Sequence, residues 1–302
     1  MKKDFLSIDY LKMEDIESIF RVTERFKQTS KTLLRINQPQ QILRGKTLAM
    51  IFAKPSTRTR ISFDVAMNQL GGHVIYLNQN DIQLGRGETI ADTARVLSRY
   101  VNGIVARLFA HEDLLELAKN ASVPVINGLT DLLHPCQVLS DMYTIKEKFG
   151  SLSGLKLAYV GDGNSNVCHS LMYACSRLGL EMVIACPNKY KPDKDILAAT
   201  EIKVLKDPEE AVKQADIVYT DTWASMGKEK ENKKRIKALK LYQVNSELLK
   251  LAKKTAVVMH CLPAHRGQEI TDEVMDGKQS IIFDQAENRM HVQKGILVWL
   301  IG

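Results

Sequence analysis

Short apolar segments alternate with helix-length amphipathic segments along most of this chain, and this alternation limits the possible folds more than any other feature. Strands alternating with helices form parallel sheets whose two faces are covered by helices. The sequence therefore predicts an α/β fold. The expected strands are residues 47–52, 74–77, 103–106, 123–126, 156–160, 182–185, 203–205, 216–220, 256–259 and 280–283.

The expected strands fall into two groups of similar size. A long helical segment at 135–148, followed by Gly150-Ser-Leu-Ser-Gly154, separates the groups. We therefore expect two similar lobes, residues 1–138 and 139–285, each a parallel sheet flanked by helices. The length of 302 residues agrees with two domains of ordinary size. Residues 286–302 are expected to form a last helix that packs back on the first lobe.

The composition is typical of a globular protein, with 45% hydrophobic and 25% charged residues. No apolar run approaches the roughly 18 residues of a membrane span, and the first residues lack the apolar core of a secretory signal. The five cysteines form no C-x-x-C pair and no zinc-binding pattern, so reduced thiols and a cytoplasmic location are expected.

The positive charge of the chain is unevenly distributed. The net charge is +7, and the segment 228–240 holds seven basic residues and two acidic ones. A positive charge favours anionic partners in a general sense. This segment lacks aromatic residues for base stacking, so we expect a solvated loop and helix face and no nucleic-acid binding.

The most informative segment is Phe52-Ala-Lys-Pro-Ser-Thr-Arg-Thr-Arg60, which follows an expected strand and begins an expected helix. Ser56 or Thr57 suits the N-cap position. Arg58 and Arg60 then lie in the first turn, where the helix dipole favours acidic residues. An anion would resolve this conflict, because a phosphate accepts backbone N–H groups, hydroxyl groups and a guanidinium together.

The alternative for these arginines is an ion pair with a local carboxylate, such as Asp64 or Glu88. We prefer this alternative for Arg60, which lies on a different helix face, and the phosphate for Arg58. The chain contains no glycine-rich P-loop pattern and no kinase pattern, which indicates a phosphate that is not part of a nucleotide.

The segment Ser56-Thr-Arg-Thr-Arg60 resembles the carbamoyl-phosphate signature of the aspartate and ornithine carbamoyltransferases. Other motifs match at corresponding intervals over essentially the whole chain. They are Gln83, Arg107, His134-Pro-Cys-Gln137, Asp221-Thr-Trp-Ala-Ser-Met-Gly227, His260-Cys-Leu-Pro-Ala264 and Glu287-Asn-Arg289. The Ser-Met-Gly and His-Cys-Leu-Pro motifs are typical of the ornithine branch.

The resemblance implies a carbamoyl transfer from carbamoyl phosphate to L-ornithine, which gives L-citrulline and phosphate. The neutral δ-amine would attack the carbonyl directly, in a cleft between the lobes, with no metal or organic cofactor. It also implies a set of carbamoyl-phosphate ligands. These are Ser56, Thr57, Arg58, Thr59, Gln83, Arg107, His134, Gln137, Cys261, Leu262 and Arg289.

Two residues of this set are expected to act on the carbonyl oxygen. Arg107 follows an expected strand at the sheet edge where open α/β folds place ligands, although a surface arginine is an equal alternative from the residues alone. His134 precedes Pro135, a good first helical residue. The nearby positive helix end favours a neutral imidazole that donates a hydrogen bond. By itself, such a histidine is more often structural. Cys136 is expected only to pack.

The resemblance further implies that Asn166, Asp221, Ser225 and Met226 bind ornithine, and that Cys261 pairs with Asp221 to orient the attacking amine. Asn164 remains an alternative to Asn166, because the motif carries one additional residue here. The alternative for Cys261 is a buried small hydrophobe. A nucleophilic thiol is disfavoured, since His260 would point to the opposite face of an extended chain.

The loop that contains Gln83 reaches into a neighbouring subunit in this family, so a homotrimer or a multiple of trimers is implied. The alternative for Gln83 is a solvated loop residue. The aspartate branch carries a substrate-binding lysine in this loop. Here no lysine occurs between His73 and Lys119, which disfavours aspartate as the substrate.

Three rival functions remain at this point. The acceptor could be putrescine or another ornithine-like amine. The turn Gly161-Asp-Gly-Asn-Ser-Asn166 could serve a nucleotide-dependent oxidoreductase, although it lacks a third glycine and a clear ribose-binding acid. The chain could also be an interaction protein that retains the site without activity, which the complete set of polar residues disfavours.

Overall fold

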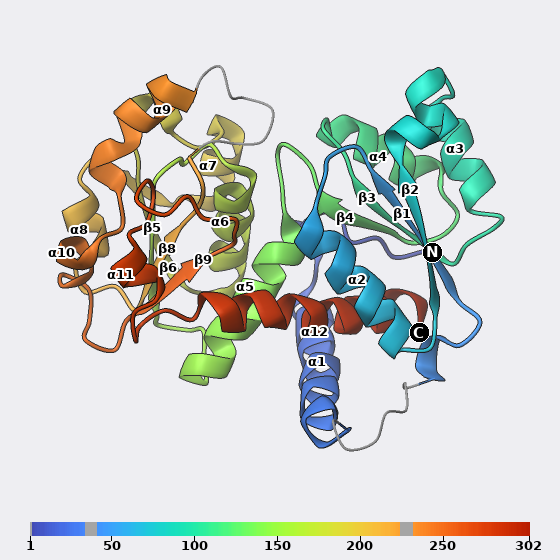
Figure 1. The fold of residues 1–302 in the computed structure, drawn as a ribbon, viewed down its shortest axis with the longest axis horizontal. Helices are drawn as coiled ribbons and strands as arrows, with labels where there is room; N and C mark the ends of the chain where they lie inside the picture. The colour runs from blue at the N-terminus through green and yellow to red at the C-terminus, as the bar shows by residue number, and fades with distance from the viewer. Residues whose placement is uncertain (1, 34–40, 224–231) are drawn as a thin grey trace. The chain divides into compact units, whose positions relative to one another are not determined.

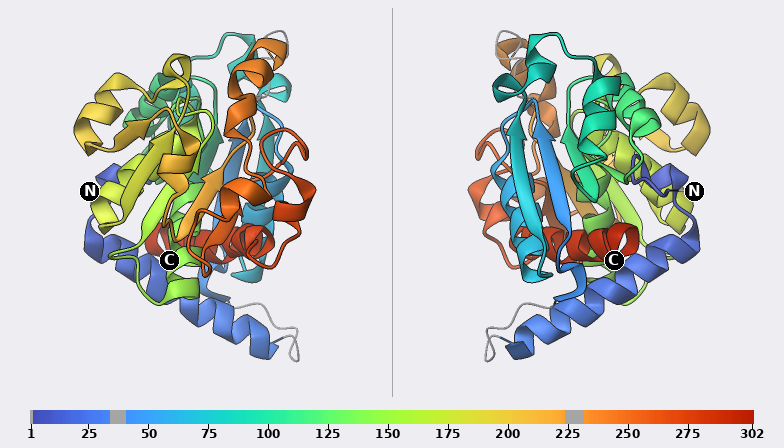
Figure 2. Two further views of the ribbon diagram at one scale, coloured as in Figure 1. Left: turned by 90° about the vertical axis from the view of Figure 1, so that its left-hand side faces the viewer. Right: turned by 90° about the vertical axis from the view of Figure 1, so that its right-hand side faces the viewer.

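The computed structural model describes residues 2–33, 41–223 and 232–302, which form two compact units (Figures 1 and 2). The first unit contains Met1–Tyr143 and Glu287–Gly302, and the second contains Thr144–Ala286. Each unit has one parallel sheet with helices on its faces, so the expected α/β fold class is confirmed. Within the described residues, none of the helices combines the length and the hydropathy that a bilayer span requires.

The sheet of the first unit has the strand order β2-β1-β3-β4, with all pairs parallel. Strands β1, β3 and β4 are almost completely buried, whereas the edge strand β2 is partly exposed. The strands are β1 Thr47–Phe52, β2 His73–Asn78, β3 Gly103–Arg107 and β4 Val125–Leu129. The associated helices are α1 Met13–Leu33, α2 Thr57–Gln69, α3 Ile90–Leu97, α4 His111–Asn120, α5 Pro135–Phe149 and α12 Ile282–Ile301.

The sheet of the second unit has the strand order β7-β6-β5-β8-β9 and is also entirely parallel. Its strands are β5 Lys156–Val160, β6 Glu181–Ala185, β7 Lys203–Leu205, β8 Ile217–Thr220 and β9 Val257–His260. Its helices are α6 Asn166–Leu178, α7 Lys194–Thr200, α8 Pro208–Val212, α9 Asn232–Leu239, α10 Ser246–Leu249 and α11 Asp272–Met275.

Each sheet reverses its winding direction once. The chain moves from β1 outward to β2 and returns to β3 on the other side of β1, and it moves from β5 through β6 and β7 before β8 pairs with β5. Ligands of open α/β sheets bind outside the carboxyl ends of the strands at such a reversal. The ends of β1 and β3, and those of β5 and β8, are therefore the places to look for a site.

One expected strand is wrong. Residues 280–283 do not form a strand, because Ser280 makes only an isolated bridge with Val258 and α12 begins at Ile282. The backbone N–H of Gln285 already donates to the carbonyl of Ile281 at 2.9 Å. A short apolar run does not distinguish a strand from a helix start by its periodicity, which explains the error. The other expected strands occur with small changes at their ends.

The C-terminal part of α12 packs on α1 within the first unit. A Cβ atom at Gly295 would lie 2.5 Å from Thr23 Oγ1 and 2.7 Å from the carbonyl oxygen of Ile19, so only glycine fits this close approach. At the end of the helix, Trp299 Nε1 donates to Asp15 Oδ1 at 3.1 Å. These contacts fix the last helix against the N-terminal helix and position Arg289.

Candidate active site

The segment between β1 and α2 forms a capped helix N-terminus. Ser56 is the N-cap residue, and its Oγ accepts a hydrogen bond from the backbone N–H of Thr59 at 3.2 Å. The first turn of α2 contains no acidic residue. The free N–H groups of the first turn and the positive end of the helix dipole therefore have no carboxylate within that turn beside them, which suits a bound phosphate.

Three arginines gather at this helix end. Arg58 is half-buried in the first turn, Arg107 ends β3 with 5% exposure, and Arg289 on α12 is 3% exposed. The guanidinium of Arg289 donates to Thr59 Oγ1 at 2.8 Å. Within the described parts of the chain, no carboxylate pairs with Arg58 or Arg107, and Arg107 Nε is buried without a hydrogen-bond partner.

The charges of these arginines act on one another. Burial, and then the charges of Arg289 and Arg58, lowers the pKa of Arg107 to about 10, so this guanidinium still carries its charge at neutral pH. Burying positive charges without negative partners is unfavourable unless a ligand supplies the opposite charge. The cluster of Arg58, Arg107 and Arg289, which we call the arginine cluster, therefore has the chemistry of an anion site.

Arg60 behaves differently from the expectation. Its guanidinium carbon lies 3.7 Å from the ring centroid of Tyr76 on β2, and among the described contacts it forms no ion pair with Asp64 or Glu88. The expected ion pair is therefore wrong, and a cation–π contact replaces it. This contact holds Arg60 on β2, on a different face from Arg58.

His134 and Gln137 lie at the start of α5 in the same unit, and both side chains are buried. Burial, followed by the charges of Arg289, Arg107 and Arg58, lowers the pKa of His134 well below its ordinary value. The imidazole is therefore neutral, as expected, because it is buried and lies beside three guanidinium groups. Gln137 Nε2 donates to Asp141 at 2.8 Å, whereas Gln137 Oε1 is buried without a partner among the described residues.

Two neighbouring residues do not join this cluster. Cys136 is completely buried, and its thiol donates to the carbonyl of Asn127 at 3.2 Å. Burial raises the pKa of Cys136 to about 12, so its role is packing. Gln83 is exposed at the start of a short 3-10 helix, Gln83–Arg86, and no described contact joins it to the arginine cluster.

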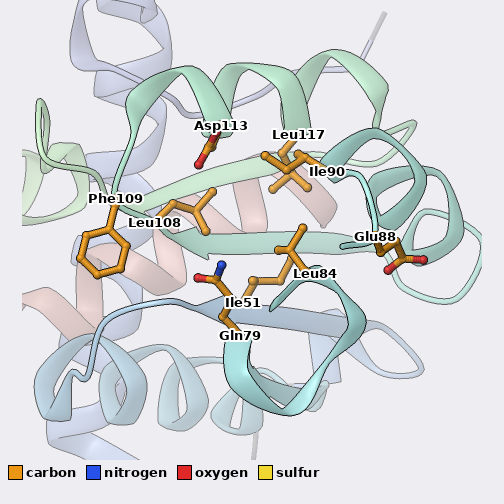
Figure 3. A pocket seen from close by; sticks show the side chains of 9 residues that line it. All are labelled: Ile51, Gln79, Leu84, Glu88, Ile90, Leu108, Phe109, Asp113 and Leu117. Carbon is orange, nitrogen blue, oxygen red and sulfur yellow. The ribbon is translucent and has the colours of Figure 1, made fainter. Parts of the chain in front are cut away.

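A separate cavity of about 220 Å³ lies in the first unit (Figure 3). Aliphatic and aromatic side chains form most of its lining, and one of its carboxylates, Glu88, accepts a hydrogen bond from Thr93 at 2.8 Å. None of the three arginines lines it, so this cavity is not the anion site. The lining residues are Ile51, Gln79, Leu84, Glu88, Ile90, Leu108, Phe109, Asp113 and Leu117.

In the second unit, Asp221 and Cys261 come together from the ends of β8 and β9. The thiol of Cys261 donates to Asp221 Oδ1 at 2.8 Å, and both residues are less than a tenth exposed. Burial raises the pKa of Asp221, while His260 and the Cys261 hydrogen bond act in the opposite direction. A buried carboxylate that accepts from a thiol can accept equally from an amine N–H.

His260 lies close to this pair, contrary to the expectation. A ring nitrogen of His260, the Cys261 sulfur and an Asp221 oxygen lie within 4.8 Å of one another. The assumption of an extended chain was wrong, because Leu262 has a φ of +58° and its backbone N–H returns to donate to His260 Nδ1 at 2.8 Å. The other ring nitrogen, Nε2, faces Glu269 Oε1 at 3.2 Å.

By composition, Asp221, His260 and Cys261 could hold a metal ion, but their hydrogen bonds already use the ligand atoms. The Cys261 thiol donates to Asp221. His260 Nδ1 accepts from the Leu262 N–H, which leaves the proton on Nε2, directed at the fully buried Glu269. The arrangement is a hydrogen-bond network, and it suits the binding of an amine.

The turn Gly161–Asn166 follows β5 at the place where the sheet reverses. Asn166 is half-buried as the first residue of α6, directly after the N-cap residue Ser165. Asn164 is exposed, and its backbone N–H donates to Asp162 Oδ1 at 3.1 Å. The side chain of Asn166 thus lies at a helix N-terminus, where a substrate carboxylate is favoured.

The basic segment 228–240 contains a residue that sequence reasoning missed. Arg235 is 8% exposed and forms a buried ion pair with Asp162, so it is not part of a solvated face. Its Nε also donates to the carbonyl of Trp223 at 2.7 Å. Ser225 and Met226 lie outside the described residues.

Comparison with known proteins agrees with the division of the chain into two units. Residues 3–147 match the model of the aspartate/ornithine carbamoyltransferase carbamoyl-P binding domain, and residues 153–300 match that of the Asp/Orn binding domain of the same family.

Relatives match over most or nearly all of the chain. The ornithine carbamoyltransferase of Pyrococcus horikoshii is 54% identical over 309 residues, which cover 99% of this chain and 96% of that protein. That of Methanothermobacter thermautotrophicus is 57% identical over 272 residues, covering 87% and 90%. The solved structure of the Pyrococcus furiosus ornithine carbamoyltransferase has a TM-score of 0.92 and 52% identity, covering 99% of this chain and 97% of that one.

Proposed function

The chain belongs to the aspartate/ornithine carbamoyltransferase family, and from this premise we propose how its residues divide the work of the reaction. It is an enzyme that transfers the carbamoyl group of carbamoyl phosphate to L-ornithine, giving L-citrulline and phosphate. The alternative of a nucleotide-dependent oxidoreductase is not supported, since the two family models span nearly the whole chain.

Carbamoyl phosphate binds at the N-terminus of α2. Ser56, Thr57 and Thr59 supply hydroxyl and backbone N–H donors, and Arg58 and Arg289 supply positive charge. The single observation that carries this assignment is that Arg107, which is buried, and Arg58, which is half-buried, lack carboxylate partners among the described residues. Phosphate oxygens provide the missing negative charge.

The carbonyl oxygen of the carbamoyl group is polarised by Arg107, His134 and Thr59. Negative charge develops on this oxygen as the amine attacks, and preorganised donors at that place lower the barrier. The neutral imidazole of His134 donates one hydrogen bond without adding a fourth positive charge to the site. The carbamoyl NH₂ donates to Gln137 Oε1, which has no other partner among the described residues, and to the carbonyl of Leu262.

The δ-amine of ornithine is oriented by Asp221 and Cys261. The thiol lies 2.8 Å from the carboxylate, so an amine nitrogen near both has an acceptor for its proton and a group that fixes its direction. The amine then attacks the carbonyl carbon directly, the C–O bond to the phosphate breaks, and phosphate leaves with the bonding electrons. No covalent intermediate forms on Cys261.

The amino-acid end of ornithine is held by Asn166, Ser225 and Met226, with Asn164 as the second candidate for the carboxylate. We also propose that the enzyme is a homotrimer, or a multiple of trimers, in which the Gln83 loop serves a neighbouring subunit. The exposure of Gln83 supports a role outside its own subunit. The five free cysteines support a reducing, cytoplasmic location.

A colorimetric citrulline assay tests the acceptor. With carbamoyl phosphate present, ornithine should give citrulline and one equivalent of phosphate, whereas aspartate and putrescine should give no product above background. Putrescine is the informative comparison, because it has the amine but not the carboxylate that Asn166 would bind. Equal rates with putrescine and ornithine, or no citrulline at all, would overturn the proposed function.

A further inference from the structure

The turn between β5 and α6 is built around a hydrogen-bond chain that the reaction itself does not use. Tyr159 lies on β5 and is completely buried. Its hydroxyl group donates to the carbonyl of Asp162 at 3.1 Å, and the Ser165 hydroxyl lies 3.0 Å from the same Tyr159 oxygen. Since the Tyr159 proton is directed at Asp162, Ser165 is the donor in the second bond.

The chain of hydrogen bonds continues into the helix. Ser165 Oγ accepts from the backbone N–H of Cys168 at 3.1 Å, as the N-cap of α6. One hydroxyl group, that of Tyr159, therefore connects Asp162 near the start of the turn with Ser165 at its end. Burial raises the pKa of Tyr159 well above its ordinary value, so the hydroxyl keeps its proton throughout the working pH range.

Other contacts allow the turn little freedom. A Cβ atom at Gly163 would lie 2.8 Å from the carbonyl oxygen of Tyr190 and 3.0 Å from the sulfur of Cys186, so the backbone is packed tightly there. The carboxylate of Asp162 is paired with Arg235 and also accepts from the Asn164 N–H. The packing at Gly163, the ion pair of Asp162 and the hydrogen bonds of Ser165 therefore fix the turn together.

We propose that the hydroxyl group of Tyr159 is a positioning group for the amino-acid substrate. By holding Asp162 and Ser165 at a fixed separation, it sets the direction in which Asn166, the next residue, meets the substrate carboxylate. Tyr159 itself does not touch the substrate. This inference rests on the proposed function, in which Asn166 binds that carboxylate.

The test is Tyr159→Phe, which removes the hydroxyl and keeps the ring that stacks on Tyr219 at a centroid distance of 6.0 Å. The KM for ornithine should rise about three- to tenfold, the factor that one hydrogen bond is worth. The KM for carbamoyl phosphate should stay within about twofold of wild type. L-Norvaline has the backbone of ornithine without the δ-amine, so its inhibition constant should rise by the same factor as the KM.

Tyr242→Phe is the matched control. Tyr242 lies in the same unit, is 7% exposed, and donates to the carbonyl of Lys206 at 2.8 Å, so the variant loses the same type of bond away from the turn. It should leave both Michaelis constants unchanged. Ser165→Ala breaks the chain at its other end. If Tyr159 and Ser165 act through one chain of hydrogen bonds, their effects should not add. The KM of the double variant for ornithine should then be no higher than that of the single variant with the higher KM.

The outcomes separate two failures. If the wild-type enzyme forms no citrulline, the proposed function fails. If it does, but Tyr159→Phe keeps both the ornithine KM and the norvaline constant within twofold, the positioning role is wrong. An equal rise for both substrates, together with a lower Tm than that of Tyr242→Phe, would indicate a purely structural tyrosine and would also overturn it. Should Tyr159→Phe fail to fold, Ser165→Ala and Ser165→Thr decide, with the threonine variant expected to restore the wild-type KM.

Discussion

The polar groups of the two units are balanced in opposite ways. In the first unit, the arginine cluster concentrates positive charge at a helix N-terminus with no carboxylate to neutralise Arg58 or Arg107 among the described residues. In the second unit, Asp162 pairs with Arg235, and Asp221 accepts from Cys261. In the first region Arg58 and Arg107 lack a negative partner that a ligand can supply, whereas the carboxylates of Asp162 and Asp221 in the second already have internal partners.

The difference follows from the chemistry of the two substrates. A phosphate carries a full negative charge, so donors left without partners bind it strongly and need no rearrangement. An attacking amine must be neutral, and an unbalanced carboxylate beside it would favour the ammonium form. The hydrogen bond from the Cys261 thiol makes Asp221 a weaker partner for an ammonium group, while the carboxylate can still accept a hydrogen bond from the neutral amine. The comparison predicts that substitutions in the first unit cost activity, whereas those in the second also cost stability.

The largest effect is expected at Arg107. Arg107→Met should lower kcat/KM for carbamoyl phosphate by roughly 100- to 1000-fold, because it removes a preorganised donor from the carbonyl oxygen. The Tm should not fall, since the variant breaks no ion pair and relieves the burial of a positive charge. Steady-state kinetics and thermal unfolding measure the two quantities. A clear fall in Tm together with near-normal kinetics would reverse the assignment of the two regions.

The second prediction concerns Arg235. Arg235→Met should lower the free energy of unfolding by about 3–5 kcal/mol, because it leaves the Asp162 carboxylate buried without its positive partner. Lys203→Met is the control. Lys203 pairs with Glu210 at 3.3 Å, and the two side chains are 63% and 57% exposed, so the expected loss is below about 1 kcal/mol. Denaturant unfolding of both variants measures the two losses. Equal losses would contradict the statement that the buried Asp162–Arg235 ion pair stabilises the second unit.

A smaller effect is expected at Cys261. Cys261→Ala removes a hydrogen bond to the Asp221 carboxylate, and bonds to charged groups are worth about 1.5–3 kcal/mol, so kcat should fall roughly 10- to 150-fold. Cys261→Ser keeps a donor and should lose less. Mass spectrometry of the intact wild-type enzyme during turnover should detect no carbamoylated cysteine. A trapped adduct on Cys261 would contradict the direct transfer.

The fold was accessible from the sequence because burial and periodicity are local signals. Strands such as 47–52 and 156–160 are short apolar runs between helical segments, and their ends mark where polar site residues must lie. Ser56 and Asp221 each follow a strand, and Arg107 ends one, at the sheet edge where open α/β folds bind ligands. The position of these residues along the chain was therefore enough to expect a site.

The errors arose where a side chain depends on a distant partner. Arg235 lies in a basic run that looks solvated, and only its pairing with Asp162, 73 residues earlier, explains its burial. Arg60 contacts Tyr76 on a neighbouring strand rather than a carboxylate nearby. A ring nitrogen of His260 lies within 4.8 Å of the Cys261 sulfur, in a segment where Leu262 adopts a positive φ that its residue type does not predict.

The smallest expected effect is on the pH profile of kcat/KM, in which the ornithine amine should titrate and His134 should not. The pKa of the ornithine δ-amine should be close to the lysine value of roughly 10.4, so kcat/KM for ornithine should rise with pH from about 6 to 9. The pKa of His134 lies well below its ordinary value, so this imidazole stays neutral over that range and the profile should show no break near 6.5. A break near pH 6.5 that disappears in His134→Asn would show that His134 titrates and that the arginine cluster does not suppress its charge.

The same shift of His134 has a defined effect on stability. The unfolded chain binds a proton at this histidine below about pH 6.5, whereas the native imidazole, buried beside the arginines, does not. Because the unfolded state then holds more protons, the free energy of unfolding should fall as the pH decreases below 6.5, and this dependence should weaken in His134→Asn. Bound inorganic phosphate should weaken it in part, since an anion beside the arginine cluster offsets the charges of the arginines, while burial, the largest cause of the low pKa of His134, remains. If phosphate raised the Tm but left the slope of stability against pH unchanged, the anion would bind away from His134. The proposed phosphate site beside the arginine cluster would then be wrong.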